Sequence, residues 1–323
     1  MPSLIKFGRS MRIMLQVGTG VVLPIAMWQD GRPVGPGLSL GASFVVRRST
    51  SPQPHECNLT ITGLSRVTRE LITKVYEQAE EMAFKTRALL QAGKIRIDAG
   101  YGLDVATLFI GDIAPDGVHH EYLGPGHATH LRALDGRVPW KGRFVNRMTN
   151  TNVDLNTITQ VLAMEGDYMS GLDAGATLAQ RFPHLIKKKL GFPGYESGYA
   201  IFGESRSQNA QICADLGITP FFQDGELRYA AADLATLDFA VILSALSPGA
   251  LLDWSPLGLG RYRVRTLMEH RMRPGRQVVL TDDFAKPIGK GLFRVEAMVA
   301  EGGNRTPGYG VEADLIPTAL PGT

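Results

Sequence analysis

The segment "HHEYLGPGHATH" contains the densest group of possible metal ligands in the sequence, and its candidates are His119, His120, Glu121, His127 and His130. Imidazole nitrogens beside a carboxylate are ligands that zinc commonly takes. The Gly-Pro-Gly step in the middle, however, predicts a loop followed by a strand, and no second cluster supplies a clean fourth ligand. We therefore favour surface-loop histidines over a metal site, and we predict neither a metal nor a cofactor.

Other patterns that could carry catalysis have simpler explanations. A phosphate-binding loop needs Gly, four residues, then Gly-Lys and a hydroxyl residue, and "PIGKGLF" has neither that spacing nor the hydroxyl. The Gly-x-Gly of "LGLGRYR" precedes a predicted strand instead of a helix, so both stretches are typical of turns. The pair Glu80–Glu81 falls on a predicted helix, where adjacent carboxylates diverge by about 100°. We predict no catalytic residues and no enzymatic activity.

Three arginines form the most prominent basic pattern. Arg261, Arg263 and Arg265 alternate along one predicted strand, so they project from the same face. A row of like charges is mildly costly unless something opposes it, which favours either a surface for phosphates or an acidic protein, or else a solvated sheet face. The aromatic residues that interleave with basic ones in single-strand binding are missing, so we predict no sequence-specific nucleic-acid binding.

Composition sets limits on the class of protein. The chain has 323 residues, 44% of them hydrophobic and 20% charged, with a net charge of +3. These values predict two or three globular domains, and the small charge gives no argument for a nucleic-acid partner. Two cysteines, Cys57 and Cys213, are too few for a disulfide framework and fit a reducing compartment. No apolar run approaches the ~18 residues of a membrane helix, and we expect no signal peptide, so we predict a soluble protein without membrane insertion.

The elements that would position these residues are mostly short strands. "MRIMLQV", "NLTITGL", "KIRIDAGY" and "TLFIGDI" alternate apolar and polar residues between glycine and proline turns, which predicts a barrel or sandwich. One long helix is predicted over residues 65–92, with Ser65 as N-cap and Gly93 as the stop. Its broad apolar stripe combines two rows. One row contains Val67, Leu71, Val75, Met82 and Leu89, and the other contains Ile72, Tyr76, Ala79, Ala83 and Leu90.

The chain divides into three predicted parts. Residues 1–149 form a first β-barrel with the inserted helix. Residues 150–235 form a small α+β module, in which "SQNAQICADLGITPFFQDGELRYAA" predicts a helix, a strand, an Asp-Gly turn and a strand. In residues 236–323, "GRYRVRTLM", "RQVVLTD", "GLFRVEAMVA" and "GYGVEADLIP" predict a second β-barrel without the long helix. The fold class is therefore mainly β with an α+β module in the middle.

Several of these stretches, in this order, resemble one family. "PHECNLTITGLSRVTRELI" followed by "KIRIDAGYGLDVATLFIGDI" is similar to the first barrel of baseplate or tail hub proteins of tailed bacteriophages and related contractile injection machines. "SQNAQICADLGITPFFQDGELRY" resembles the small α/β domain of that family, and "LMEHRMRPGRQVVLTDD" with "KGLFRVEAMVAEGG" resembles its second barrel. The helix at 65–92 is longer than the family pattern.

The resemblance implies a structural role. Each hub chain carries two barrels of the tail-tube type, and three chains form a ring that adapts a six-fold tail tube to a three-fold central spike, with DNA passing through the bore. Expected partners are further copies of this chain, the tail tube protein, the central spike protein and other baseplate proteins. The expected location is the virion tail tip, assembled in the bacterial cytoplasm. We take Arg261, Arg263, Arg265, Val75, Met82 and Leu89 as interface candidates, and a tail-associated cell-wall hydrolase as the alternative function.

Overall fold

The computed structural model describes residues 8–318 with gaps. The gaps fall at 18–20, 36–39, 52, 87–92, 124–125, 136–143, 150–152, 155–157, 159–160, 162–168, 171–193, 196, 217, 225, 232–239, 245–249, 282–291 and 305. Leu89 and Leu90 of the predicted long helix lie outside the described residues. The described part is mainly β, as the sequence predicts.

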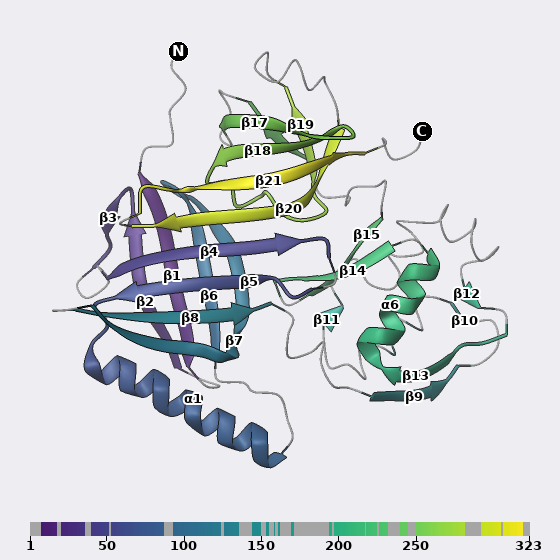
Figure 1. The fold of residues 1–323 in the computed structure, drawn as a ribbon, viewed down its shortest axis with the longest axis horizontal. Coiled ribbons are helices and arrows are strands. Elements are labelled where there is room, and N and C mark those ends of the chain that lie inside the picture. Colours follow the sequence, from purple (N-terminus) through teal and green to yellow (C-terminus); the bar gives the residue numbers. More distant parts are fainter. Residues whose placement is uncertain are drawn as a thin grey trace.

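The first β unit consists of two strand layers that cross (Figure 1). One layer holds β1 (Arg9–Val17), β2 (Val21–Gln29), β3 (Arg32–Pro33) and β6 (Gly93–Tyr101), and the other holds β4 (Gly41–Ser49), β5 (Glu56–Thr62) and β8 (Gly126–Leu134). The long strand β7 (Asp104–Leu123) belongs to both, because its first half pairs with β6 and its second half pairs with β8. An irregularity between Ile113 and Val118 separates these halves, and such irregularities bend a strand.

The second β unit continues the same sheet. It contains β16 (Val241–Leu243), β17 (Leu251–Gly258), β18 (Arg261–Leu267), β19 (Gln277–Leu280), β20 (Leu292–Gly303) and β21 (Gly310–Pro317). The strand order is β17-β18-β21-β20-β4-β5-β8-β7-β6-β1-β2-β3. The two units meet where residues 297–303 of β20 pair antiparallel with residues 43–49 of β4. Buried side chains from both units form one hydrophobic cluster, which includes Ile13 and Phe44 from the first unit and Val264 and Leu315 from the second.

Tyr309, which lies just before β21, connects the two β units. Its hydroxyl donates to the carbonyl of Ser10 at 2.6 Å and accepts from the amide of Gly100 at 3.1 Å. Its ring meets the ring of Tyr101 edge to face at 5.4 Å, and the Tyr101 hydroxyl donates to its carbonyl. A buried hydroxyl group needs hydrogen-bond partners. The partners of the Tyr309 hydroxyl lie in β1 and β6, so these bonds connect the start of β21 to those two strands.

The middle module lies to one side of the two β units (Figure 1). Its elements are β9 (Phe144–Met148), β10 (Val153–Asp154), β11 (Met169–Ser170), β12 (Gly194–Tyr195), β13 (Ala200–Glu204), α6 (Ser205–Leu216), β14 (Ile218–Gln223) and β15 (Glu226–Ala231). The predicted order of helix, strand, turn and strand is confirmed in α6, β14 and β15. The boundaries proposed at residues 149 and 235 remain predictions.

Helix α1 (Arg66–Thr86) packs beside the second half of β7 (Figure 1). Ser65 caps it as predicted, because its hydroxyl accepts the amide of Thr68 at 3.1 Å. The row that faces the core contains Ile72, which is buried, with Tyr76 and Ala79 packed beside it. No described helix is long and apolar enough to cross a bilayer.

One face of the continuous sheet is polar over eight strands, from β17 to the second half of β7. Alternation along each strand directs one set of side chains to the core and the other to solvent. We call the solvent side the polar face. Cross-strand neighbours on it include Asp253, Arg265, Glu312, Val299, Arg47 and Glu56 in one row, and Ser255, Arg263, Asp314, Ala297 and Ser49 in the next.

The β4–β20 pair should be sensitive to added volume at Gly302. A Cβ there would lie 2.6 Å from Cζ of Phe44 and 2.9 Å from Cδ2 of Tyr309, and both rings are buried. We expect Gly302→Ala to lower the free energy of unfolding by about 1–3 kcal/mol, the usual cost of overpacking. Urea denaturation measures this. Gly308→Ala is the control, because a Cβ at Gly308 meets no atom within 4 Å, and equal stability of both variants would contradict the packing argument.

Candidate assembly interface

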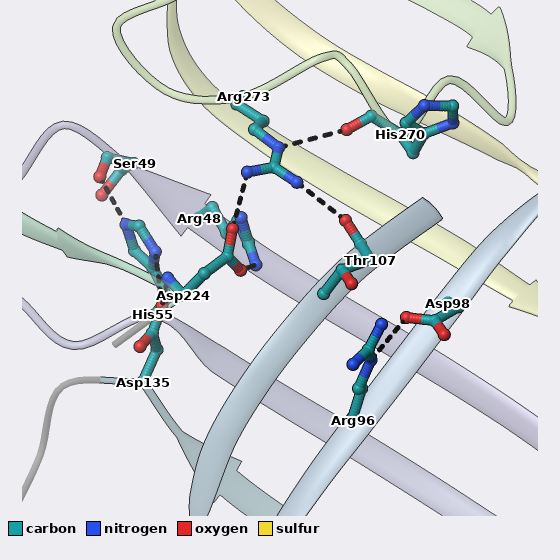
Figure 2. A network of polar contacts seen from close by, with 10 residues as sticks. All are labelled: Arg48, Ser49, His55, Arg96, Asp98, Thr107, Asp135, Asp224, His270 and Arg273. Carbon is teal, nitrogen blue, oxygen red and sulfur yellow. Dashed lines mark hydrogen bonds and ion pairs between the residues drawn. The ribbon is translucent and has the colours of Figure 1, made fainter. Parts of the chain in front are cut away.

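Asp224 joins all three parts of the chain. It follows β14 in the middle module, and its carboxylate accepts from Arg48 of β4 at 2.5 Å and from Arg273 of the second β unit at 2.7 Å (Figure 2). Arg273 also donates to the carbonyl of Thr107 in β7 at 2.9 Å. We call Arg48, Asp224 and Arg273 the Asp224 junction, because these contacts fix the middle module against both β units.

Burial makes this junction electrostatically demanding. The side chain of Arg48 is 1% exposed and that of Asp224 is 17% exposed. Burial acts to raise the pKa of Asp224, but the charges of Arg48 and Arg273 outweigh it and hold the pKa below its usual value. The guanidinium of Arg48 also lies 5.8 Å from the ring centre of Phe109, so its charge faces both a carboxylate and a π system.

Asp135 holds the backbone at Asp224, and His55 lies beside Asp135. Asp135, directly after β8, accepts the amide of Asp224 at 2.6 Å through its carboxylate. Nε2 of His55 donates to the carbonyl of Ser49 at 2.8 Å, and its Nδ1 lies 3.7 Å from the same Asp135 carboxylate. Asp224 has φ +58°, a conformation that Asp and Asn adopt more readily than other non-glycine residues. The turn at Asp224 is therefore favoured by its own residue type and is also held by the hydrogen bond from its amide to Asp135.

The arginine row lies on the polar face and is opposed by acidic side chains. Arg263 makes two bonds to Asp314 of β21, at 2.7 and 3.1 Å, and lies 3.5 Å from Glu312. Arg265 is the cross-strand neighbour of Glu312 and of Asp253, and Arg261 is exposed at the start of β18. The row is thus part of a charge-balanced sheet face, where opposite charges on facing strands stabilise each other.

The basic residues that follow β18 serve the fold. Arg271 donates twice to the buried carboxylate of Glu269, at 2.7 and 2.8 Å, and Arg276 donates to the carbonyl of Arg271 at 3.3 Å. Arg273 belongs to the Asp224 junction. These side chains bind within the chain, so they do not extend the arginine row into a larger positive surface.

The helix candidates divide between the core and the surface. Val75 packs partly against the core, whereas Met82 is 67% exposed, and Leu89 lies outside the described residues. Val67 and Leu71 lie on the same flank of α1 as Met82 and are 75% and 38% exposed. We call Val67, Leu71 and Met82 the α1 ridge.

The prediction that the histidine cluster lies in a surface loop is wrong. His119 and His120 belong to β7, and His127 and His130 belong to β8, so the cluster is a strand hairpin with His119 paired to His130. His130 contacts Glu121 at 3.1 Å on the polar face. No group of three or more His, Cys, Asp or Glu is placed to hold a metal within the part of the chain that the structure describes.

The His120 side chain lies on the opposite face of the β7–β8 hairpin, where it contacts α1. Its Nε2 lies 2.9 Å from the hydroxyl of Thr73 in α1, and its Nδ1 lies 3.0 Å from the hydroxyl of Thr129. Burial, and then the charge of Arg69, lower the pKa of His120, which favours the neutral ring in this role.

Comparison with solved structures finds a similar fold in tail proteins. A tail protein from Neisseria meningitidis MC58 aligns with a TM-score of 0.54 and 11% identity over 95% of this chain and 96% of that one. The 43 kDa tail protein of prophage MuSo2 from Shewanella oneidensis aligns with a TM-score of 0.54 and 10% identity over 95% and 98%.

A third similar structure comes from a secretion machine. The E. coli c3393 protein, described as a type VI secretion component with structural similarity to the T4 tail proteins gp27 and gp5, aligns with a TM-score of 0.53 and 11% identity over 88% of this chain and 76% of that one. No protein-family model matches the sequence, and no curated protein matches it. The chain therefore has the fold of bacteriophage and type VI secretion tail proteins, and the likeness shows the fold alone.

Removing the negative charge of Asp224 tests how much the Asp224 junction contributes to stability. Asp224→Asn keeps the side-chain shape and tolerates the positive φ, but it leaves Arg48 buried without a counter-charge. We expect a loss of about 3–5 kcal/mol of unfolding free energy at pH 7, the usual cost of breaking a buried ion pair. Urea denaturation measures this, with Glu70→Gln as the control, since the Arg66–Glu70 pair is exposed and should have no measurable effect.

The contribution of Asp224 to the free energy of unfolding should depend on pH. Because the folded-state pKa of Asp224 is lowered, its stabilisation is fully present above the unfolded pKa of about 3.9 and is lost as the pH falls through the folded pKa. The stability difference between the natural protein and Asp224→Asn should therefore shrink below about pH 4. A difference that stays constant down to pH 2 would contradict this assignment.

Proposed function

We propose that this chain is the baseplate or tail hub of a bacteriophage or a related contractile machine. In this proposal three copies form a ring that adapts a six-fold tail tube to a three-fold central spike. The tube protein, the spike protein and other baseplate proteins are its partners, and DNA passes through the bore without sequence readout. Its location is the tail tip, after assembly in the bacterial cytoplasm.

One feature of the sheet supports the six-to-three adaptation. Of the eight strands behind the polar face, β17, β18, β21 and β20 come from the second β unit, and β4, β5, β8 and β7 come from the first. Each chain thus presents two consecutive four-stranded segments. Three chains would present six similar segments to a six-fold partner while keeping true three-fold symmetry.

The polar face suits the wall of a bore. In Figure 1 no helix covers β17 to β5, and α1 lies beyond the β7 end of the sheet. Positive and negative side chains alternate across it, as in Arg265, Glu312, Arg47 and Glu56. A strongly positive wall would bind the phosphate backbone and hold DNA in place, whereas a balanced wall gives little net attraction.

The proposal is tested by the number of copies and the symmetry that the chain adopts when its partners are present. We expect the purified chain, mixed with its tube and spike proteins, to enter a particle that contains three 35.1-kDa copies and shows three-fold symmetry by electron microscopy. A chain that stays monomeric with both partners present would contradict the proposal. The alternative, a wall hydrolase, predicts a cleared band on a peptidoglycan zymogram, and we expect none.

A further inference from the structure

A pocket opens at the edge of the polar face, near the turn that joins β20 to β21. Its lining includes residues of the neighbouring strands β18, β21, β20 and β4, which lie side by side in Figure 1. Its volume is about 720 Å³, within the range of about 300–1,000 Å³ that is typical of ligand sites. We call it the polar-face pocket, and its lining residues indicate what it can bind.

Arg9 holds one rim of this pocket in place. The turn between β20 and β21 contributes Pro307 and Gly308 to the lining. The guanidinium of Arg9 donates to the carbonyls of Thr306 and Pro307 at 2.6 and 2.8 Å, and it lies 5.3 Å from the ring centre of Tyr309. These contacts fix the turn against β1, so this rim is already formed in the folded chain.

Two other arginines in the lining have no partner. Arg47 of β4 and Arg265 of β18 are exposed, and neither makes a hydrogen bond or an ion pair within the part of the chain that the structure describes. A guanidinium carries five N–H donors in a fixed planar fork, which matches the two oxygens of a carboxylate or a phosphate. The pocket therefore offers two sets of unused donors to an anionic group.

The acidic neighbours of these two arginines are engaged elsewhere. Opposite the β4 arginine, Glu56 accepts from Arg132 at 3.0 Å. Opposite the β18 arginine, Glu312 lies 3.5 Å from Arg263, and Asp253 on the other side accepts a backbone amide at 2.7 Å. Charge balance over the whole polar face thus leaves a local excess of donors inside the pocket.

The two arginines are placed to act on one ligand. Arg265, Glu312, Val299 and Arg47 form one row across four strands, so the two arginine Cα atoms are three strand spacings apart, or about 14 Å. Two extended arginine side chains can bridge this distance around a single anionic group. Both line the same pocket, so a group bound there can accept from both.

We propose that the polar-face pocket binds a carboxylate carried by a segment of a partner protein, with Arg47 and Arg265 as its donors. The carboxylate belongs to an aspartate or glutamate that has apolar residues beside it. Because the pocket lies within one chain, this inference goes beyond the hub proposal and does not depend on the ring.

The charges of the lining favour an isolated anion over a polyanion. Glu301 and Glu312 line the pocket together with the arginines, and Glu301 is exposed. A nucleic acid carries a negative charge on every phosphate, so a strand crossing the pocket would bring some of these charges close to the two glutamates. A single carboxylate can bind beside the arginines without this repulsion, because it carries no second charge.

The apolar part of the lining favours a protein segment over a free anion. Leu252, Leu267, Val299 and Pro307 line the pocket, and Leu252 is 53% exposed. Ligand sites typically combine an apolar lining with a few polar groups that fix the orientation of the ligand. Apolar side chains beside the carboxylate would cover these residues, whereas acetate or phosphate would leave most of them in water.

NMR spectra of the arginine Nε–Hε groups test this inference on the full chain. The probe is the capped tripeptide Leu-Glu-Leu, and Leu-Gln-Leu is its uncharged control of the same shape. We expect Leu-Glu-Leu to shift the signals of Arg47 and Arg265 and to leave that of Arg263 in place, because Asp314 already binds Arg263. No shift with Leu-Glu-Leu, or an equal shift with Leu-Gln-Leu, would overturn the inference.

Substitutions on one strand provide a matched pair of variants. Arg265→Gln removes one donor from the pocket and should raise the dissociation constant of Leu-Glu-Leu about three- to tenfold. Arg261→Gln removes an exposed arginine from the same strand and the same face, but Arg261 does not line the pocket, so the constant should not change. Equal effects of both variants would show only a general attraction by positive charge and would overturn the site.

Other anions separate the possible sources of the negative charge. We expect acetate, inorganic phosphate and a single-stranded oligonucleotide each to bind more weakly at Arg47 and Arg265 than Leu-Glu-Leu does. Acetate or phosphate that binds as tightly as the peptide would overturn the protein segment as ligand, and an oligonucleotide that binds more tightly would overturn the carboxylate. All these measurements use the chain without tube or spike proteins, so a negative result leaves the hub proposal standing.

Discussion

The antiparallel pairing of β20 with β4 is the contact on which the rest of the structure depends. Each of these strands would be an edge if its unit stood alone, and an open edge is a site for unwanted association. Their pairing satisfies both edges and gives one polar face and one hydrophobic cluster. The two β units therefore cannot change their relative orientation without breaking backbone hydrogen bonds, and at this joint the rings of Phe44 and Tyr309 leave no room for a side chain at Gly302.

Ion pairs hold the middle module in place, whereas backbone hydrogen bonds hold the two β units together. A buried ion pair contributes little net stability, since removing two charges from water costs about as much as their attraction returns, but it penalises any geometry that separates them. Asp224 contacts one arginine from each β unit, so a shift of the module against either unit leaves a buried charge unpaired. The junction thus sets orientation, and the β4–β20 pair sets the sheet.

Local structure was readable from the sequence, and long-range pairing was not. Alternation, turn residues and the Ser65 cap predicted most strands, α1 and the β14–β15 hairpin, because these signals act over a few residues. The polar residues on both sides of the Gly-Pro-Gly step hid the strands that carry the histidines. The acidic partners of Arg263 come from β21, some fifty residues away, and only the strand order reveals them.

One sequence signal did point to the Asp224 junction. Phe44, Val46 and Arg48 share one face of β4, and an arginine in the core-facing series implies a buried counter-charge. What the sequence could not give was the partner, because Asp224 lies in another module and also fits an ordinary Asp-Gly turn.

The proposed ring has six joints of two kinds. Three are β20–β4 pairs inside a chain, where both strands are covalently linked and share a core, so their pairing does not depend on concentration. The other three would lie between copies and would carry the whole entropic cost of association. Register shifts at both ends of β17, and Pro256 within it, shorten the stretch of this strand that another strand could pair with. Because the joints inside each chain form when the chain folds, the proposed ring needs only the three contacts between copies in order to close.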